Sequence, residues 1–182
     1  MSVTQHDLDY QRVTNASVLT SLLQPENDAY IVIHGDGQRQ TTLEFLQVLT
    51  TQWPKIRVLL DVGAQILDLS NHQVAEVWLY MAHGVSGAVY FNENDELTVL
   101  TRTGITQLLS TSPFSQQLDC CVVYLDHAHT RGTDLKFSIG SRAAVTLGPK
   151  VTKDALVQGS FLCLHPIAKC SWSLISRLHA DA

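Results

Sequence analysis

VVYLDHAHTRGTDLK, residues 122–136, is the stretch that decides the fold of this chain. Its first four residues are apolar, and polar residues begin abruptly at Asp126. A short, continuous apolar run is typical of a strand at the centre of a sheet that is covered on both faces. The stretch therefore predicts a buried strand that delivers a polar loop to one edge of a sheet.

The remaining sequence alternates between strand-like and helix-like segments. The strand-like runs are residues 29–37, which end in a glycine turn, 55–66, 121–126 and 142–148. The helix-like segments are residues 41–51, 69–81, 104–110 and 152–158, the last with Thr152 as its cap. This alternation predicts an α/β fold with a mainly parallel sheet and flanking helices, like half of a Rossmann-like or RecA-like fold. Two further runs, 87–91 and 97–100, flank a polar turn and add one antiparallel hairpin.

Composition and charge exclude several classes of protein. The hydrophobic content of 45% is typical of a globular domain, and the net charge of -5 argues against nucleic-acid binding, which depends on clustered Lys and Arg. No stretch approaches the length of an apolar membrane span, and the first residues do not resemble a secretory signal. The cysteines have no spacing typical of a secreted disulfide framework. We therefore expect a cytoplasmic protein without membrane contacts.

The 182 residues divide into three expected parts. Residues 1–28 form a helical or irregular lead-in, residues 29–158 form the α/β domain, and residues 159–182 form a divergent tail.

A ligand site is expected where the strands end, because ligands of α/β sheets gather at the carboxyl ends of the strands. Asp61 ends the run VLLD and is expected at the same edge as the polar loop. We predict a ligand-binding site formed by Asp61, Arg131, Thr133 and Asp134. Structural alternatives stay open: Asp61 and Asp134 can cap turns, and Arg131 can pair with Asp126 or Asp134.

Several segments carry a family resemblance. YLD-AHTRGTDLK, RAAVTLGP, TKD and LVQ resemble the carboxyl-terminal signature of very large fungal proteins catalogued as a ubiquitin thioesterase or ubiquitinyl hydrolase family. The similarity runs from about residue 56 to residue 158. Because family members are many times longer, the resemblance implies that this chain is a fragment of a larger polypeptide.

The resemblance implies thiol-dependent hydrolysis of ubiquitin conjugates, with ubiquitin or ubiquitinated proteins as partners and no cofactor. The candidate catalytic residues in this chain are Asp126, His127, His129 and Cys121. However, Cys121 begins the strand that ends before His127, and strand residues at about 3.3 Å each place the two roughly 20 Å apart. We therefore expect Cys121 to be buried, and this chain alone to lack a complete active site.

A second implied chemistry comes from the same motif. In the family the core reads Asp-Glu-Ala-His, which is similar to the metal- and nucleotide-binding box of helicases, and the RGTD segment resembles a helicase and SecA-type coupling motif. In this chain His127 stands where the Glu would be, and no GxxxxGK[ST] phosphate loop is present. The alternative function is therefore a catalytically inert, nucleotide-handling or scaffolding module related to helicase motors.

A third interpretation treats His127 and His129 as metal ligands of a hydrolase. In an extended segment alternate side chains share a face, so the two imidazoles could bind one ion together with Asp126 or Asp134. Two histidines in one loop are more often hydrogen-bonded polar residues than ligands. We therefore assign no metal.

The tail is expected to differ from the domain. The resemblance stops after Gln158, and Gly159 and Pro166 are both poor residues for a helix interior. We expect a helix that ends early and a poorly ordered segment that leaves Trp172 exposed.

Overall fold

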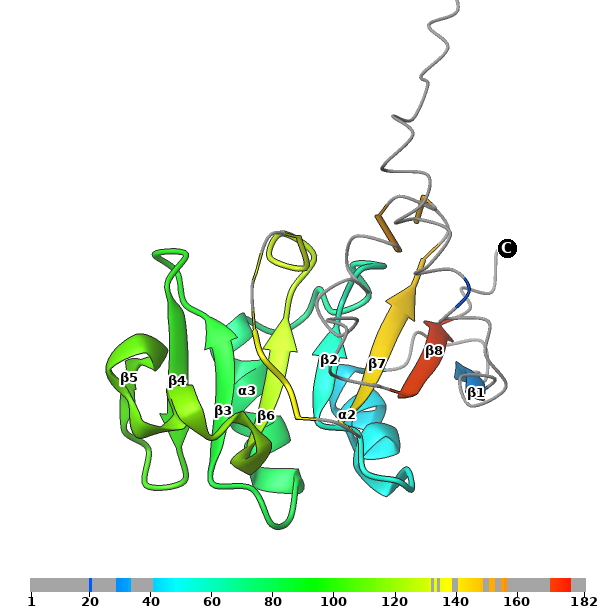
Figure 1. Cartoon of the computed structure of the whole chain (residues 1–182). Coiled ribbons are helices and arrows are strands. Elements are labelled where there is room, and N and C mark those ends of the chain that lie inside the picture. Colours follow the sequence, from blue (N-terminus) through cyan, green and yellow to red (C-terminus); the bar gives the residue numbers. More distant parts are fainter. Residues whose placement is uncertain are drawn as a thin grey trace, which may run out of the picture.

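The computed structural model describes residues 20, 29–33, 41–131, 133, 135–138, 141–148, 151, 152, 155, 156 and 171–177. These residues form one sheet with helices packed against it (Figure 1). The helices are α2 (Thr42–Thr51) and α3 (Asn71–Met81). The strands are β1 (Ala29–Ile33), β2 (Val58–Leu60), β3 (Gly87–Phe91), β4 (Leu97–Thr101), β5 (Thr106–Leu108), β6 (Cys121–Leu125), β7 (Arg142–Leu147) and β8 (Ser171–Arg177).

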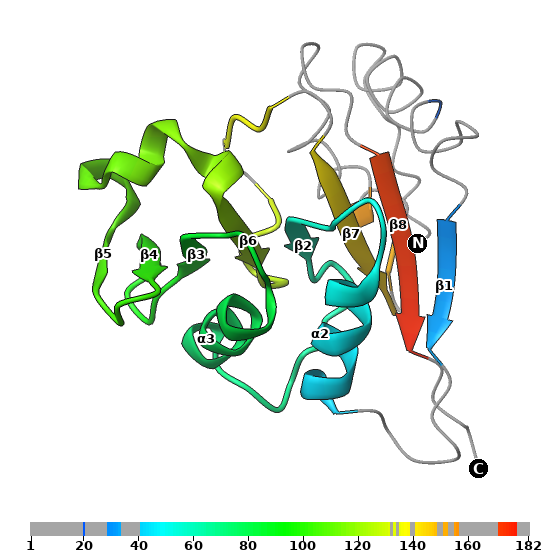
Figure 2. The same ribbon diagram turned by 90° about the horizontal axis from the view of Figure 1, so that it is seen from below.

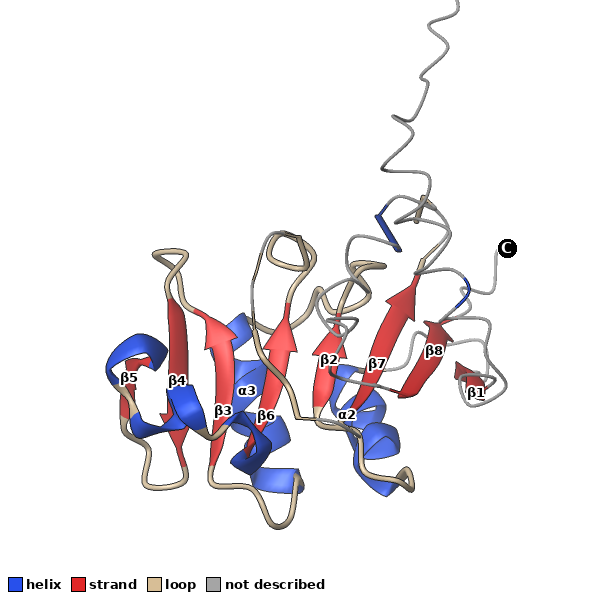
Figure 3. Cartoon of the chain, viewed as in Figure 1, coloured by secondary structure: helices blue, strands red, loops and turns tan. Residues whose placement is uncertain are grey.

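The strands follow the order β1-β8-β7-β2-β6-β3-β4-β5 across an eight-stranded sheet. The neighbouring strands in the part β1-β8-β7-β2-β6-β3 are all parallel to each other. The pairs β3–β4 and β4–β5 are antiparallel. The predicted α/β fold with a mainly parallel sheet and one hairpin is therefore confirmed, and β5 extends the antiparallel part by one strand. Figure 3 shows the strand arrows of this sheet in front of α2 and α3.

Both helices begin at a capping box, which satisfies backbone donors that a first helical turn leaves unpaired. The Thr41 hydroxyl accepts from the backbone N–H of Glu44, and the Glu44 carboxylate accepts from the backbone N–H of Thr41. Ser70 and Gln73 make the same exchange at α3. The predicted start of α3 is thereby confirmed, and Trp78 is a core residue with 1% of its surface exposed.

The two faces of the sheet are covered differently. Helices α2 and α3 lie side by side on one face, as Figure 2 shows, and pack against Leu59, Val122 and Tyr124. On the other face, Val58, Val123 and neighbouring residues are covered by short 3-10 helices and by residues 135–138. These 3-10 helices are Leu109–Thr111, Pro113–Gln116 and Leu118–Cys120. All five residues of β6 are buried, which fits the central strand that its sequence predicts.

Two segments differ from the prediction. Residues 104–110 are not a helix: Thr106–Leu108 form β5 and a 3-10 helix follows, because the backbone of this segment pairs with β4. Ser171–Arg177 lie in β8, between β1 and β7, so this part of the tail is a paired strand rather than an unpaired segment. The side chain of Trp172 lies outside the described part of the structure.

Thr152 caps the next helical turn as predicted, since its hydroxyl accepts from the backbone N–H of Ala155 at 3.2 Å. The end of this turn, at Gln158, lies outside the described residues. Among the helices of the described residues, none is long and apolar enough to cross a membrane.

Candidate functional site

Two aspartates lie at the carboxyl edge of the sheet, as the sequence predicts. Leu60 of β2 pairs with Leu125 of β6, so Asp61 and Asp126, which follow directly, leave neighbouring parallel strands at the same edge. The backbone N–H of Asp61 also donates to the carbonyl of Leu125 at 2.9 Å. Asp134, the third predicted member, lies outside the described residues.

Asp61 holds a turn together instead of facing a ligand. Its carboxylate accepts from the backbone N–H groups of Gln65 (2.8 Å) and Ile66 (3.0 Å), and from the Thr146 hydroxyl at 2.6 Å. Only 1% of its surface is exposed. The prediction that Asp61 binds ligand is therefore wrong, because a buried carboxylate with these donors has no access to one.

Asp126 anchors a cluster of polar side chains above β6. One carboxylate oxygen accepts from Asn71 Nδ2 at 3.0 Å, and the other contacts His129 Nδ1. The Nε2 atom of His129 lies 3.1 Å from Asp95 Oδ1. Both ring nitrogens of His129 therefore face carboxylate oxygens. We name Asn71, Asp95, Asp126 and His129 the edge cluster.

Three elements that are distant in sequence form the edge cluster. Asn71 is the first residue of α3, Asp95 lies in the turn between β3 and β4, and Asp126 follows β6. Phe91, the last residue of β3, stacks on the His129 ring at 4.0 Å with an interplanar angle of 7°. Its carbonyl accepts a second bond from Asn71 Nδ2 at 3.0 Å. The cluster therefore ties α3 and the hairpin to the loop after β6.

His127 does not join His129 in a metal site. Residues 127–130 form a turn, not an extended segment, so the two imidazoles do not share a face. His127 is exposed and its Nδ1 lies 2.9 Å from the carbonyl of Val62, whereas both nitrogens of His129 face carboxylates. Within the described residues, no group of three potential ligands could hold a metal ion. The described residues therefore do not show the pair of imidazoles on one face that the metal interpretation requires.

Thr133 and Arg131, two further predicted site residues, differ in their contacts. The Thr133 hydroxyl donates to the carbonyl of His129 at 2.7 Å, which closes the turn. Arg131 is exposed, and the bonds to the Asp126 carboxylate come from Asn71 and His129 rather than from Arg131. The expected Arg131–Asp126 pair is therefore wrong, while a pair with Asp134 lies outside the described residues.

Cys121 lies at the opposite end of β6, at the amino edge of the sheet. It is fully buried, and burial, with a smaller contribution from the neighbouring Cys120, raises the pKa of its thiol to about 12. Within the described residues, no hydrogen bond joins this thiol to a histidine. The expectation that Cys121 is buried is therefore confirmed, and its raised pKa disfavours the thiolate, which is the form that a catalytic cysteine needs.

A cavity of about 600 Å³ adjoins the edge cluster. It lies between the start of α3 and the β3–β4 turn, and Asn71 and Phe91 belong both to its lining and to the cluster's contacts. In the same lining, His72 Nδ1 lies 2.8 Å from the Tyr90 hydroxyl, whose pKa is raised by burial. The residue types of Asn71 and Asp95 do not indicate that they belong to a site. The one sequence signal for Asn71 is its position at the start of a helix near the carboxyl edge of the sheet.

Comparisons of this chain with protein-family models, with curated proteins and with solved structures find no match.

Proposed function

We propose that this chain is a non-hydrolytic, nucleotide-binding module that belongs to a longer, ubiquitin-thioesterase-like polypeptide. The observation that carries the proposal is the 600 Å³ cavity at the carboxyl edge of a mainly parallel sheet, beside the edge cluster. This is the position in which α/β folds of this kind bind ligands. The volume also falls within the range of about 300–1,000 Å³ that is usual for small-molecule sites.

The lining favours the base and sugar of a nucleotide over its phosphates. The exposed Asn94 amide carries both a donor and an acceptor, as the edge of a nucleobase does, whereas the amide oxygens of Gln73 and Asn92 already accept from backbone N–H groups of the helix cap and the turn. Phe91, which is only partly buried, adds aromatic surface. Among the described residues that line this cavity there is no Lys or Arg, so the phosphates would extend outside it.

The ubiquitin part of the proposal rests on the sequence resemblance alone. Thiol-dependent hydrolysis of ubiquitin conjugates would belong to other parts of the longer polypeptide, because burial raises the pKa of the Cys121 thiol to about 12. The chain would then contribute a binding function to a protein whose partners are ubiquitin or ubiquitinated proteins.

Calorimetric titration with adenosine and with ADP tests nucleotide binding. We expect both to bind, with similar affinity, because the phosphates lie outside the cavity. Asn94→Ala removes an exposed amide from the lining and should weaken both about tenfold, the effect of one lost hydrogen bond. Gln47→Ala, at an exposed position of α2, is the matched control and should bind like the unchanged chain.

Two results would contradict the proposal. The first is the absence of binding at millimolar nucleotide, or binding that Asn94→Ala does not weaken. The second is stoichiometric labelling by an aldehyde-type ubiquitin probe that disappears in Cys121→Ala, which would identify a self-contained thiol hydrolase.

A further inference from the structure

A second cavity lies at the opposite, amino edge of the sheet, beside Arg57. The backbone of Arg57 is fixed at the start of β2: its N–H donates to the carbonyl of Arg142 at 2.9 Å, and its carbonyl accepts from Val123 at 2.8 Å. Arg57 is only partly buried, but its guanidinium Nη1 is buried and has no hydrogen-bond partner among the described residues. Buried polar donors usually have a partner, so this Nη1 is the group that an anionic ligand could satisfy.

The cavity that Arg57 lines has a volume of about 250 Å³. Apolar side chains, among them Val123 and Phe137, form much of its wall. Asp119 also lines it, but its carboxylate accepts a hydrogen bond from the Ser138 hydroxyl. Among the described lining residues Arg57 is the only basic one, and its guanidinium can bind a carboxylate through two parallel N–H···O bonds.

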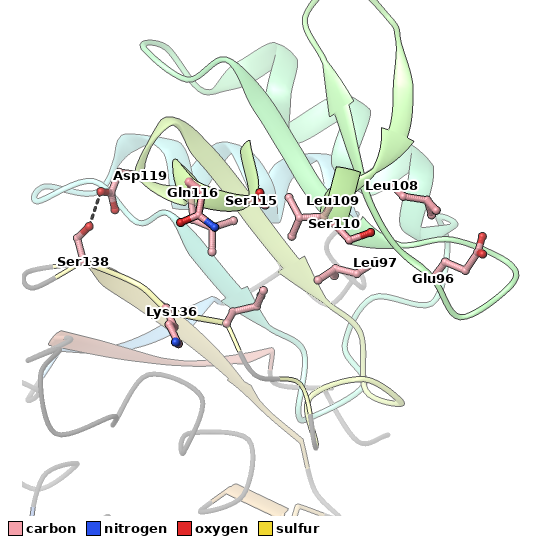
Figure 4. Close-up of a pocket in the computed structure, with 12 residues that line it drawn as sticks. Glu96, Leu97, Leu108, Leu109, Ser110, Ser115, Gln116, Asp119, Lys136 and Ser138 are labelled. Carbon is pink, nitrogen blue, oxygen red and sulfur yellow. Dashed lines mark hydrogen bonds between the residues drawn. The ribbon is translucent and has the colours of Figure 1, made fainter. Parts of the chain in front are cut away.

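A larger groove of about 670 Å³ continues from this cavity. Leu118, Asp119 and Ser138 line both, and Figure 4 shows the bonded pair Asp119 and Ser138 at one end of the groove with Glu96 at the far end. A ligand with its carboxylate beside Arg57 can therefore extend its body along the groove.

The groove lining combines apolar, polar and charged residues, the charged ones being Glu96, Asp119 and Lys136. Leu109 and Leu135 are among its leucines, while Ser110, Ser115 and Gln116 present hydroxyl and amide groups. Peptide N–H and C=O groups can bond the polar members while side chains cover the leucines. A fatty acid would leave the polar members without partners on desolvation.

We propose that this groove binds the free carboxyl terminus of an apolar peptide, with the terminal carboxylate paired to Arg57. This site is separate from the cavity at the carboxyl edge and does not depend on nucleotide binding. The guanidinium supplies the charge, the 250 Å³ cavity receives the last residue, and the groove receives the residues before it.

Titration of the full chain with two probe peptides tests the proposal. The probes are acetyl-Ser-Leu-Ser-Leu with a free carboxylate and the same peptide with a terminal amide. The free acid should bind about 10- to 100-fold more tightly than the amide, the range for a charge-assisted hydrogen bond, and Arg57→Gln should remove that difference.

Two further variants locate the site. Ser138→Trp fills the junction between the cavity and the groove without changing Arg57, and should abolish binding of the free acid. Arg57 also borders a smaller cavity of about 90 Å³ on the helix side, together with Lys55. Lys55→Gln should therefore leave the affinity unchanged if the carboxylate lies where we propose.

The proposal is overturned by equal affinity for acid and amide, by no binding at millimolar peptide, or by octanoate binding more tightly than the free acid. Loss of binding in Lys55→Gln with retention in Ser138→Trp would move the anion to the helix side and would also overturn it. Circular dichroism checks that each variant folds. If Arg57→Gln does not fold, the comparison of acid and amide and the Ser138→Trp variant decide the matter.

Discussion

Asp61 illustrates how a residue with the chemistry of a functional site can serve the backbone instead. Its two oxygens accept from Gln65, Ile66 and Thr146, and the Thr146 hydroxyl accepts in turn from the backbone N–H of Gly63 at 2.9 Å. This network joins the ends of β2 and β7. A buried carboxylate that satisfies several donors stabilises the fold, because those donors would otherwise be buried without partners.

Asp61→Ala should therefore lower the free energy of unfolding by about 3 kcal/mol or more, since each buried donor that loses its acceptor costs about 1–3 kcal/mol. Urea unfolding measures the change. Asp119→Ala is the control, because Asp119 is exposed, and its loss should cost less than about 1 kcal/mol. Equal losses in the two variants would show that the Asp61 network contributes little.

Cys121 predicts a specific dependence of stability on pH. Its thiol has an ordinary pKa of 9.0 when exposed and about 12 in the fold, so the folded state keeps a proton that the unfolded state releases. The stabilisation is complete below pH 9 and is lost as the pH rises towards 12.

Between pH 9 and pH 10 the unchanged chain should lose about 1 kcal/mol more stability than Cys121→Ala, which has no thiol to titrate at this position. Denaturant titrations at the two pH values measure the difference. Cys120→Ala removes an exposed thiol and should keep the steeper slope. The interpretation of Cys121 as a buried, protonated thiol fails if the two variants have the same slope.

The hairpin and the loop after β6 depend on each other through His129. The ring is 18% exposed, stacks on Phe91 and contacts Asp95, which is itself 84% exposed in the turn. The turn also has its own bonds, since Asn92 Oδ1 accepts from the backbone N–H groups of Asn94 and Glu96. His129 therefore adds a tertiary contact to a turn that is locally determined.

His129→Leu keeps apolar contact with Phe91 but removes both carboxylate bonds. We expect faster hydrogen exchange at residues 92–96 and a loss of about 1–2 kcal/mol in the free energy of unfolding. His83→Leu, at an exposed position outside the cluster, is the matched control. Unchanged exchange in the turn would show that the Asp95 contact does not order it.

Some elements of this fold follow from local sequence, and others depend on contacts between distant parts of the chain. Helix α3 was predictable because its cap and its apolar spacing are local, and β6 because five consecutive buried residues allow few alternatives. The edge cluster was not predictable, because Asn71 and Asp126 are 55 positions apart and His129 and Asp95 are 34 apart. Only the sheet order, with β6 between β2 and β3, brings them together.

The assembled sheet explains why residues 171–177 form a paired strand and not the poorly ordered segment that the sequence predicts. Local sequence gives no sign that Ser171–Arg177 pair with both β1 and β7, and β1 is the first strand of the described chain. The register joins Ala29 to Ser173 and Ser173 to Ala144, so β8 links the start of the sequence to the centre of the sheet. Such long-range parallel pairing carries no short-range signal.

A proline in the middle of β8 tests this arrangement most directly. Ser173 lies between Ala29 and Ala144, so Ser173→Pro removes a backbone donor from a strand that is paired on both sides. We expect the free energy of unfolding to fall by at least about 2 kcal/mol, and exchange at residues 29–33 to accelerate because β1 loses its paired neighbour. Ser173→Ala keeps the backbone N–H and should leave both quantities nearly unchanged. If proline and alanine behave alike, β8 does not hold β1 to the sheet, and residues 171–177 form the unpaired tail that the sequence first suggested.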